Sequence, residues 1–535
     1  MDASPGPGIR GGSRWRRAPI SVLFANMAVL AWFFTGISTF VLYVCFYRWV
    51  FMRNFKGPKA WPVIGCTLEV AWNRSRMHDW VTEYCSRFYP TWKMRFPDKD
   101  VIVSVDPANL EYVLKGNFTN FPKGEPFHVM FHDLLGNGIF NTDGDLWRRQ
   151  RKITSYEFAS KVLRDYGCDN FKAHAVNLCR ILDQASRDET PVDMMDLALR
   201  LSLESVCKLG FGVDMGSLDA SLPTLPFVKS FDYVNQRLSD RYVDPLWKLK
   251  RFLRIGSERV MAEQLKIVNS FTKELVLTRK AELEAAVHHE TRVDLLSRFT
   301  EAIKKEPFTS DPIKDLQDAV VNFLLAGRDT VAAALVWSLY AISSHPRVEE
   351  RIVEELQQLE AEKERDVSLE RAFYDFSQLL DYETVNQKMH YLQAAIFEAM
   401  RLYPAIPVNV RMALKDDILP ACGTTIRAGD SFMYSQYSQG RMKQLWGEDC
   451  LEYKPERWLK GGVCQQESQF KYPVFHGGPR LCLGKDNGLL NLRITLAMLF
   501  RFFRFQKLPT CKMTYKVTIA LLTSDEGLKM KVQKR

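Results

Sequence analysis

Several patterns that mark common protein classes are missing from this sequence of 535 residues. Its 11 cysteines are scattered, without a C-x-x-C pair or a regular spacing, which argues against both a zinc site and a disulfide scaffold. Low-complexity tracts and repeats of fixed period are absent, and the hydrophobic and charged fractions, 46% and 25%, are ordinary. The sequence therefore predicts a folded protein with reduced thiols, as in a compartment similar to the cytosol.

A sustained basic stripe is missing too, although the formal net charge is +10. Acidic and basic residues alternate through most of the chain, so no nucleic acid is expected as a partner, and an anionic membrane or an acidic protein fits the charge better. One literal G-x-G-x-x-G motif, Gly6–Gly11, stands ahead of a long apolar run, without a preceding strand or a following dinucleotide fold. We interpret it as a chance match.

The long apolar run covers residues 20–47, 28 positions without a charged side chain. A helix crosses a bilayer with about 20 residues, whereas the core of a signal peptide has only about 7–15. The run therefore predicts a single transmembrane anchor, after a polar tail at 1–19 and before a proline-containing linker at 48–65 and a soluble domain at 66–535. Positive charges flank the run on both sides, so they do not indicate its orientation.

The soluble part is mostly helical in period, with strand-like runs at Asp100–Val105 and after residue 424. This predicts a mainly α fold with a minor β-sheet region. Asp311–Pro346 is expected to form one long helix, apolar on nearly all sides around Phe323–Trp337, that passes through the centre of the fold.

The AGRDT stretch, Ala326–Thr330, interrupts the apolar character of that long helix. A glycine inside a helix costs about 1 kcal/mol relative to alanine, and Asp329 and Thr330 can compete for backbone hydrogen bonds. Two interpretations remain: a local opening of the helix, or a tolerated glycine beside a solvent-facing aspartate.

A second predicted helix carries Glu398 and Arg401 three residues apart, on one face and among apolar neighbours. A buried ion pair needs further hydrogen bonds to offset its desolvation. Arg457, in the PERW stretch, is a natural supplier of them.

The FHGGPRLCLG stretch near the C-terminus surrounds Cys482 with glycines and Arg480. A zinc site would need three more ligands, of which only His476 is in range, and no histidine partner for a catalytic thiol is indicated. A free buried cysteine remains the commonest role of any single thiol. A heme with a thiolate ligand meets every requirement, because sulfur binds iron, backbone amides tune its charge, arginine pairs with a propionate and glycines admit the porphyrin.

This stretch resembles the F-x-x-G-x-R-x-C-x-G loop of the cytochrome P-450 family. The matching residues are Phe475, Gly478, Arg480, Cys482 and Gly484. WRRQR (147–151), AGRDT, the Glu398–Arg401 pair and PERW match further family motifs in the same order. Within the family, LLGNGIFNTDGDLWRRQRK, YSQYSQGRMKQLWGEDCLEYKPERW and FHGGPRLCLGKD are similar to stretches of plant-type fatty-acid omega-hydroxylases.

The resemblance implies the mainly helical cytochrome P-450 fold and a role for each matching residue. Cys482 would be the proximal iron ligand of heme b, and Asp329 and Thr330 would relay protons to bound oxygen. Around the heme propionates the resemblance implies Trp147, Arg151, Arg480 and Arg411. Glu398, Arg401 and Arg457 would be scaffold. Ala326 stands where some animal-type fatty-acid hydroxylases carry a glutamate that attaches to the heme, so no such ester is expected.

The resemblance also implies the partners: O2, an NADPH-dependent flavoprotein reductase docking near the cysteine loop, membrane lipid and a fatty acid. The domain would face the cytosol from the endoplasmic reticulum membrane. Oxidation of a sterol or other lipid is one alternative, and a non-catalytic heme sensor or carrier is another; the intact AGRDT stretch speaks against the second. Apolar residues that suit a hydrocarbon chain, or simply the core, are Phe323, Val408, Leu521, Leu522 and the stretch 222–231.

Overall fold

A computed structural model describes residues 20–51, 55–218, 225–242, 244, 246–285, 294–361 and 371–535. The expected polar tail at 1–19 and the Gly6–Gly11 motif therefore lie outside the described residues, as does part of the 222–231 stretch.

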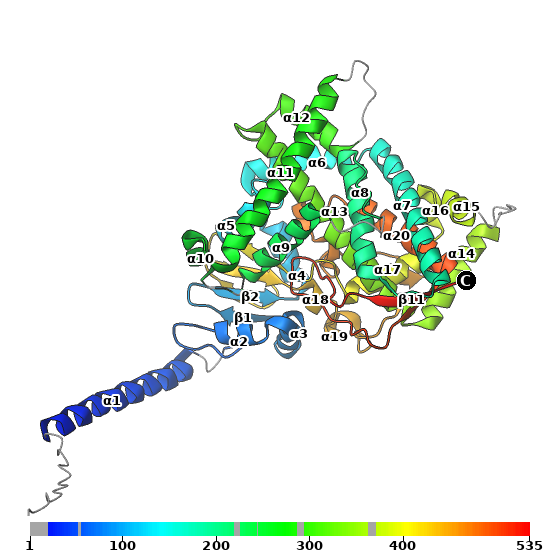
Figure 1. The fold of residues 1–535 in the computed structure, drawn as a ribbon. Coiled ribbons are helices and arrows are strands. Elements are labelled where there is room, and N and C mark those ends of the chain that lie inside the picture. The colour runs from blue at the N-terminus through cyan, green and yellow to red at the C-terminus, as the bar shows by residue number, and fades with distance from the viewer. Residues whose placement is uncertain are drawn as a thin grey trace, which may run out of the picture.

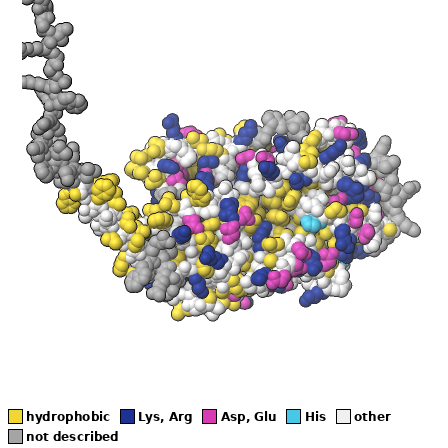
Figure 2. All heavy atoms as spheres, turned by 90° about the horizontal axis from the view of Figure 1, so that it is seen from below, with side chains coloured by type: hydrophobic (Ala, Val, Ile, Leu, Met, Phe, Trp, Pro, Cys, Tyr) yellow, Lys and Arg dark blue, Asp and Glu magenta, His cyan; other side chains and the backbone are white. Residues whose placement is uncertain are grey.

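The N-terminal helix α1, Ile20–Phe51, extends away from the body of the protein (Figure 1). It continues four residues past the predicted end of the apolar run at 47. Its described side chains are largely apolar and exposed, and Figure 2 shows them continuing into hydrophobic side chains on the adjoining surface of the body. After α1 the chain passes Pro58 and Pro62 without helix, as expected, and Trp61 forms an isolated bridge with Gly65.

Helices make up most of the body (Figure 1). Their bounds are α2 Thr67–Trp72, α3 Met77–Arg87, α4 Pro107–Glu111, α5 Glu125–Leu135, α6 Gly144–Phe158, α7 Lys161–Arg187, α8 Met194–Phe211, α9 Pro226–Asp240, α10 Trp247–Leu253, α11 Gly256–Ala285, α12 Leu295–Lys305, α13 Pro312–Ser343, α14 Pro346–Ala361, α15 Ala372–Leu379, α16 Tyr382–Gln387, α17 His390–Leu402, α18 Gln436–Gln439, α19 Lys443–Trp446 and α20 Lys485–Phe502. Short turns of other helical types are η1 Arg74–Arg76, η2 Tyr112–Gly116, η3 Phe118–Asn120, η4 Pro455–Trp458, η5 Pro473–Phe475 and η6 Gly478–Arg480.

Strands form small sheets, the largest of which has the order β1-β2-β7-β4. In it β2 and β7 run parallel and the other neighbours run antiparallel. A second sheet has the order β10-β11-β3, and two hairpins pair β5 with β6 and β8 with β9. The strand bounds are β1 Thr91–Arg95, β2 Asp100–Ser104, β3 Val192–Asp193, β4 Asn409–Met412, β5 Asp417–Ile418, β6 Thr425–Ile426, β7 Ser431–Tyr434, β8 Leu459–Lys460, β9 Val463–Cys464, β10 Phe503–Lys507 and β11 Lys529–Lys534. The predicted strands at Asp100–Val105 and after residue 424 are thus confirmed.

Helix α13 is the long central helix that the sequence predicts, and most of its residues are buried. It packs against α8, α17 and α20. A Cβ atom on Gly327 would lie 2.6 Å from Cγ2 of Val206 on α8, so the glycine is needed for the close approach of the two helices. Asp329 is only 1% exposed. The interpretation of a tolerated glycine beside a solvent-facing aspartate is therefore wrong.

A candidate heme site

The loop that carries Cys482 is closed on itself by backbone hydrogen bonds. The N–H of Cys482 donates to the carbonyl oxygen of Phe475 at 2.9 Å, and the N–H of Leu481 donates to the carbonyl oxygen of Gly478 at 3.0 Å. Gly484 follows as the N-terminal cap of α20. The loop therefore holds the sulfur at the start of a helix, where backbone N–H groups lack partners inside the helix.

The environment of this sulfur favours a thiolate only in part. Burial raises the pKa of the Cys482 thiol, whereas the N–H of Gly484 and the charges of Arg151 and Lys485 lower it. A bound metal ion would deprotonate such a thiol outright, because the ion supplies the charge that the protein leaves uncompensated. The loop thus fits a metal-bound sulfur better than a free thiolate.

Gly478 is suited to a tight turn, and the structure adds a second reason for glycine at this position. Its φ is +64°, and a Cβ atom would lie 2.0 Å from the carbonyl oxygen of Leu114. Glycine therefore permits both the left-handed backbone and the packing of the loop against η2. Gly484 differs: a Cβ atom there would find its nearest neighbour, Cε1 of Phe158, at 3.7 Å.

These two glycines give a matched pair of stability predictions. Gly478→Ala should lower the free energy of unfolding by about 2–3 kcal/mol, because left-handed backbone in alanine is strained and the carbonyl of Leu114 must move. Gly484→Ala should lower it by less than about 1 kcal/mol, since alanine fits that ordinary backbone without a clash. Denaturant titration of the two variants measures the difference, and equal losses would contradict this account of Gly478.

Trp147 and Arg151 lie one turn apart on α6, as expected, and both meet the cysteine loop. The guanidinium of Arg480 lies over the Trp147 ring, with 4.4 Å between Cζ and the ring centroid. Arg151 donates to the carbonyl oxygen of Leu481, next to the cysteine. Sequence motifs 330 residues apart are therefore in direct contact.

Asp143, which the sequence interpretation missed, is a central partner of this arrangement. One of its carboxylate oxygens accepts from Arg480 at 2.6 Å. The two oxygens also accept from the backbone N–H groups of Lys123 and Gly124 at 3.0 and 2.9 Å. Asp143 thereby joins the loop before α5 to the cysteine loop.

More cations than anions surround this carboxylate. Burial lowers the pKa of Lys123 well below its usual value, and the charges of Arg411 and Arg480 lower it further. Burial and the charge of Arg411 lower the pKa of Arg480 to about 9. Burial lowers the pKa of His476 to about 3, and the charges of Lys123, Arg411, Arg480 and Arg151 act in the same direction. This histidine is therefore neutral. Among the described residues, Asp143 is the one carboxylate that forms an ion pair in this cluster, and its partner is Arg480.

Several buried polar atoms in this cluster have no hydrogen-bond partner among the described residues: Nε of Arg411, Nε of Arg480, Nδ1 of His476 and the hydroxyl of Tyr434. Buried donors without partners are rare in folded proteins and call for an explanation. A ligand that carries more than one carboxylate would supply both the missing acceptors and the missing negative charge. Heme b, with two propionates and an iron for sulfur, fits these residues.

In the AGRDT stretch of α13, the side chains of Asp329 and Thr330 have different partners. The hydroxyl of Thr330 donates to the carbonyl oxygen of Ala326 at 2.6 Å, and α13 remains helical through this point. Ala326 and Thr330 are half-buried. Asp329 is buried, and its carboxylate accepts hydrogen bonds from Arg328 and from Asn235 of α9. The structure thus turns Asp329 toward α9, which its spacing in the sequence did not indicate.

Phe158, at the end of α6, lies between α13 and the cysteine loop. Its ring lies 6.3 Å from that of Phe323, measured between centroids, and faces Gly484. Among the other residues considered for a hydrocarbon chain, Leu521 is fully buried against Trp337, so core packing explains it. Val408 packs against the cluster around β1 and β2.

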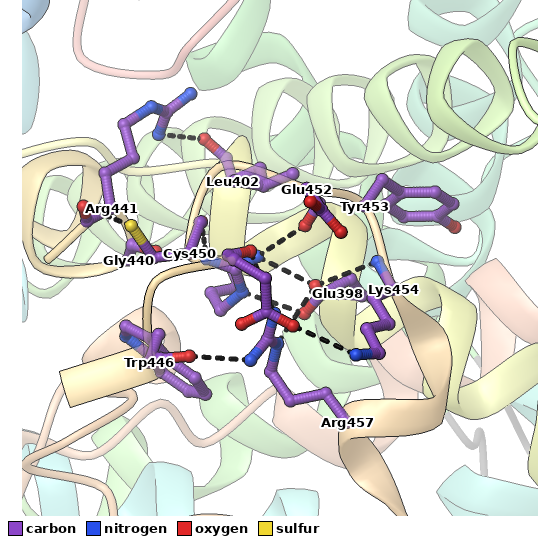
Figure 3. Close-up of polar contacts among 12 residues, drawn as sticks. Glu398, Leu402, Gly440, Arg441, Trp446, Cys450, Glu452, Tyr453, Lys454 and Arg457 are labelled. Atoms are coloured by element: carbon purple, nitrogen blue, oxygen red, sulfur yellow. Dashed lines mark hydrogen bonds and ion pairs between the residues drawn. The ribbon is translucent and has the colours of Figure 1, made fainter. Parts of the chain in front are cut away.

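Glu398, Arg401 and Arg457 form a buried ion-pair network, and Figure 3 shows Arg457 pointing toward Glu398. The Arg401 guanidinium donates to both carboxylate oxygens of Glu398, at 2.7 and 2.8 Å. Arg457 and the indole of Trp458 donate to Glu398 at 3.3 and 2.9 Å. Backbone carbonyls take up further donors of the two arginines, so the network ties α17 to the segment 440–458.

Comparisons with known proteins agree with the geometry. The family model described as "Cytochrome P450" matches residues 55–532. "Cytochrome P450 704B1" of Arabidopsis thaliana is 43% identical over 515 residues, 91% of this chain and 97% of the relative. "Cytochrome P450 704C1" of Pinus taeda is 38% identical over 509 residues, 94% and 98% of the two chains. "Noroxomaritidine synthase 2" of a Narcissus is 34% identical over 490 residues, 89% and 91%. The chain therefore belongs to the cytochrome P-450 family of heme-thiolate monooxygenases.

Proposed function

We propose that this monooxygenase hydroxylates medium- or long-chain fatty acids at or near the terminal carbon, with Cys482 as the ligand of the heme iron. The observation that supports the heme site best is the cation cluster beside Cys482. Lys123, Arg151, Arg411 and Arg480 lie around His476 there, one carboxylate, Asp143, pairs with Arg480, and several buried donors have no acceptor among the described residues. A non-catalytic heme carrier would need such a cluster equally, but it would not need the polar pair Asp329 and Thr330 on α13.

The residues of the chain divide the work around the cofactor. When bound, heme activates O2 and inserts one oxygen atom into a substrate C–H bond, while two electrons and two protons convert the other atom to water. Arg480, Arg411 and Lys123 would hold the propionates and the Cys482 thiolate would bind the iron, while Arg151 and Trp147 fix the cysteine loop. Thr330 and Asp329 supply protons, Thr330 through its hydroxyl and Asp329 through its carboxyl group.

Electrons reach this site from outside the chain. The partner is an NADPH-dependent flavoprotein reductase, which membership of the cytochrome P-450 family supports. The reductase docks on the face that carries the cysteine loop. Phe475 and Gly478 lie on this loop and shape it, the first through its carbonyl and the second through its backbone conformation.

The chain is anchored in the endoplasmic reticulum membrane by residues 20–47, with the monooxygenase domain, 66–535, on the cytosolic side. The polar tail at 1–19 and the linker at 48–65 flank the anchor, and the first residues of this linker continue α1. Two further patches of exposed apolar side chains support a membrane contact: Trp72, 89% exposed, on α2 and Phe252, 83% exposed, on α10. Lys248, Lys250, Arg251 and Arg254 on and next to α10 suit an anionic lipid surface.

The substrate class is supported by the stretches shared with plant-type fatty-acid hydroxylases and by the apolar side chains that α5, α9 and α13 bring together. These include Phe131, Phe231, Val234, Leu238 and Leu324, which pack into one buried cluster. One relative at 34% identity is named "Noroxomaritidine synthase 2", a name that does not refer to a fatty acid.

Turnover with defined substrates tests the proposal. The full chain is combined with a plant NADPH reductase in lipid vesicles and supplied with saturated fatty acids of increasing length, their methyl esters and a sterol. We expect a hydroxyl group on the terminal carbon or its neighbour of the free acids, detected by mass spectrometry of the products. Consumption of NADPH and O2 without any hydroxylated acid would contradict the substrate class, and hydroxylation of the sterol alone would favour the alternative.

A further inference from the structure

A polar network inside the protein joins α9 to α13 at Asp329. The guanidinium nitrogen NH1 of Arg328 donates to Asp329 Oδ1 at 2.9 Å and to Asp232 Oδ1, on α9, at 2.5 Å. The other oxygen of Asp329 accepts from the side-chain amide of Asn235, also on α9, at 2.7 Å. Each oxygen of the Asp329 carboxylate therefore has one partner, and both partners depend on the position of α9.

Two carboxylates compete for one guanidinium in this network. Asp329 and Arg328 are buried, whereas the side chain of Asp232 is 47% exposed and reaches solvent. Burial raises the pKa of Asp329 to about 6; the charge of Arg328 lowers it, and the charge of Asp232 raises it again. Asp329 is thus an acid that gains and loses a proton near neutral pH, with Asp232 opposing part of the effect of Arg328.

Asn235 favours the ionised form of this acid. Its Nδ2 donates to the carboxylate, and this hydrogen bond lowers the pKa of Asp329. A leucine at this place would remove the donor, so the protonated acid would be favoured.

Other elements add no competing charge at Asp329 within the described part of the chain. Helix α8 presents Cys207 near Arg328, and burial raises the pKa of this thiol so far that it stays neutral. From α9, the ring of Phe231 lies 6.0 Å from Cζ of Arg328. The charged groups that face Asp329 are therefore Arg328 on its own helix and Asp232 on α9.

We propose that Asp232 and Asn235 are positioning residues for the reaction, which set in opposite directions how readily Asp329 gives up its proton. Asp232 draws Arg328 away and makes the acid easier to protonate, whereas Asn235 stabilises the carboxylate. This inference rests on the proposed function of Asp329 in proton supply. It assigns to α9, a helix distant in sequence from the cysteine loop, a direct part in the proton balance of the site.

Two substitutions with opposite expected signs test the proposal. The measured quantity is product formed per NADPH with dodecanoic acid, which should fall at high pH as Asp329 loses its proton. In Asp232→Asn, Asp329 becomes the one carboxylate bound to Arg328, so this fall should occur at lower pH. In Asn235→Leu, the fall should occur at higher pH. Each shift should be about one pH unit, the size that one nearby charge or hydrogen bond produces. Gln236→Leu, on the next position of α9, is the matched control and should shift nothing.

A second measurement uses no turnover at all. Infrared difference spectra of the ferric heme-loaded protein, recorded against pH without substrate or reductase, follow the C=O band of a protonated carboxyl group, which Asp329→Asn identifies by its loss. The midpoint should fall in Asp232→Asn and rise in Asn235→Leu. Shifts of the same sign in both variants, or none, would overturn the positioning role.

The same set of variants separates this inference from the function on which it rests. If Asp329→Asn keeps full coupling at every pH, Asp329 supplies no proton to the reaction, and the proposed role of this residue fails. The infrared midpoints still decide whether Asp232 and Asn235 control the acid, because that measurement does not depend on turnover.

Discussion

Cys482→Ser is expected to abolish both turnover and the spectrum typical of thiolate-bound heme in the reduced, carbon-monoxide-treated protein. A serine hydroxyl keeps the shape of the side chain but does not supply the anionic sulfur that binds iron strongly and favours O–O cleavage. The cation cluster around Asp143 is untouched by this change, so some heme should remain bound through its propionates. The absorbance of the purified protein, before and after reduction with carbon monoxide, measures both effects.

Cys464→Ser is the matched control for that experiment. Cys464 is also a half-buried thiol without a disulfide, but it lies on β9, outside the loop 475–484. It should keep the thiolate spectrum and full turnover. A thiolate spectrum that survives Cys482→Ser, or that disappears in Cys464→Ser, would mean that the iron ligand has been assigned to the wrong sulfur.

Arg401→Ala is expected to cause the largest loss of stability among single substitutions of the described ion pairs. Arg401 and Glu398 are both fully buried, and alanine would leave the carboxylate without its principal partner. Breaking a buried pair on one side costs about 3–5 kcal/mol, out of a total stability of about 5–15 kcal/mol. We therefore expect little folded, heme-loaded protein, measured as heme absorbance per mole of purified chain.

Two variants keep this prediction testable if Arg401→Ala does not fold. Glu398→Gln keeps the shape of the acceptor and should lose less stability in a denaturant titration. Arg351→Ala removes one member of an exposed pair, 2.6 Å from Glu456, in which both side chains are about half exposed. Exposed pairs contribute about 0–1 kcal/mol. Equal losses for Arg351→Ala and Arg401→Ala would contradict the role given to burial.

The sequence predicted those features that depend on local pattern. The periods of apolar residues indicated α13 and α17, and β2 was recognised as a short strand-like run. The motif around Cys482 indicated the heme loop because its residue types and spacing are unusual together. The i, i+4 spacing of Trp147 and Arg151 placed both on one face of α6, which meets the loop.

What the sequence did not predict depends on contacts between distant segments. Asp143 pairs with Arg480 across 337 positions, and although it lies in a stretch similar to other family members, the sequence did not indicate this partner. The acceptor of Asn235 lies 94 positions away, so the orientation of Asp329 could not be read from AGRDT. Gly478 was recognised as essential, but its reason, the carbonyl of Leu114, comes from another part of the chain. Such pairings are set by the packing of whole helices rather than by local propensity.

The contact between α6 and the cysteine loop bears on how the protein acquires its cofactor during synthesis. Trp147 and Arg151 leave the ribosome long before Arg480 and Cys482, and domains generally begin to fold from the N-terminal side. The complete site needs both segments, since the sulfur and Arg480 come from the later one and Trp147 and Arg151 come from the earlier one. Cofactor capture is consequently a late event, which follows release of nearly the entire polypeptide.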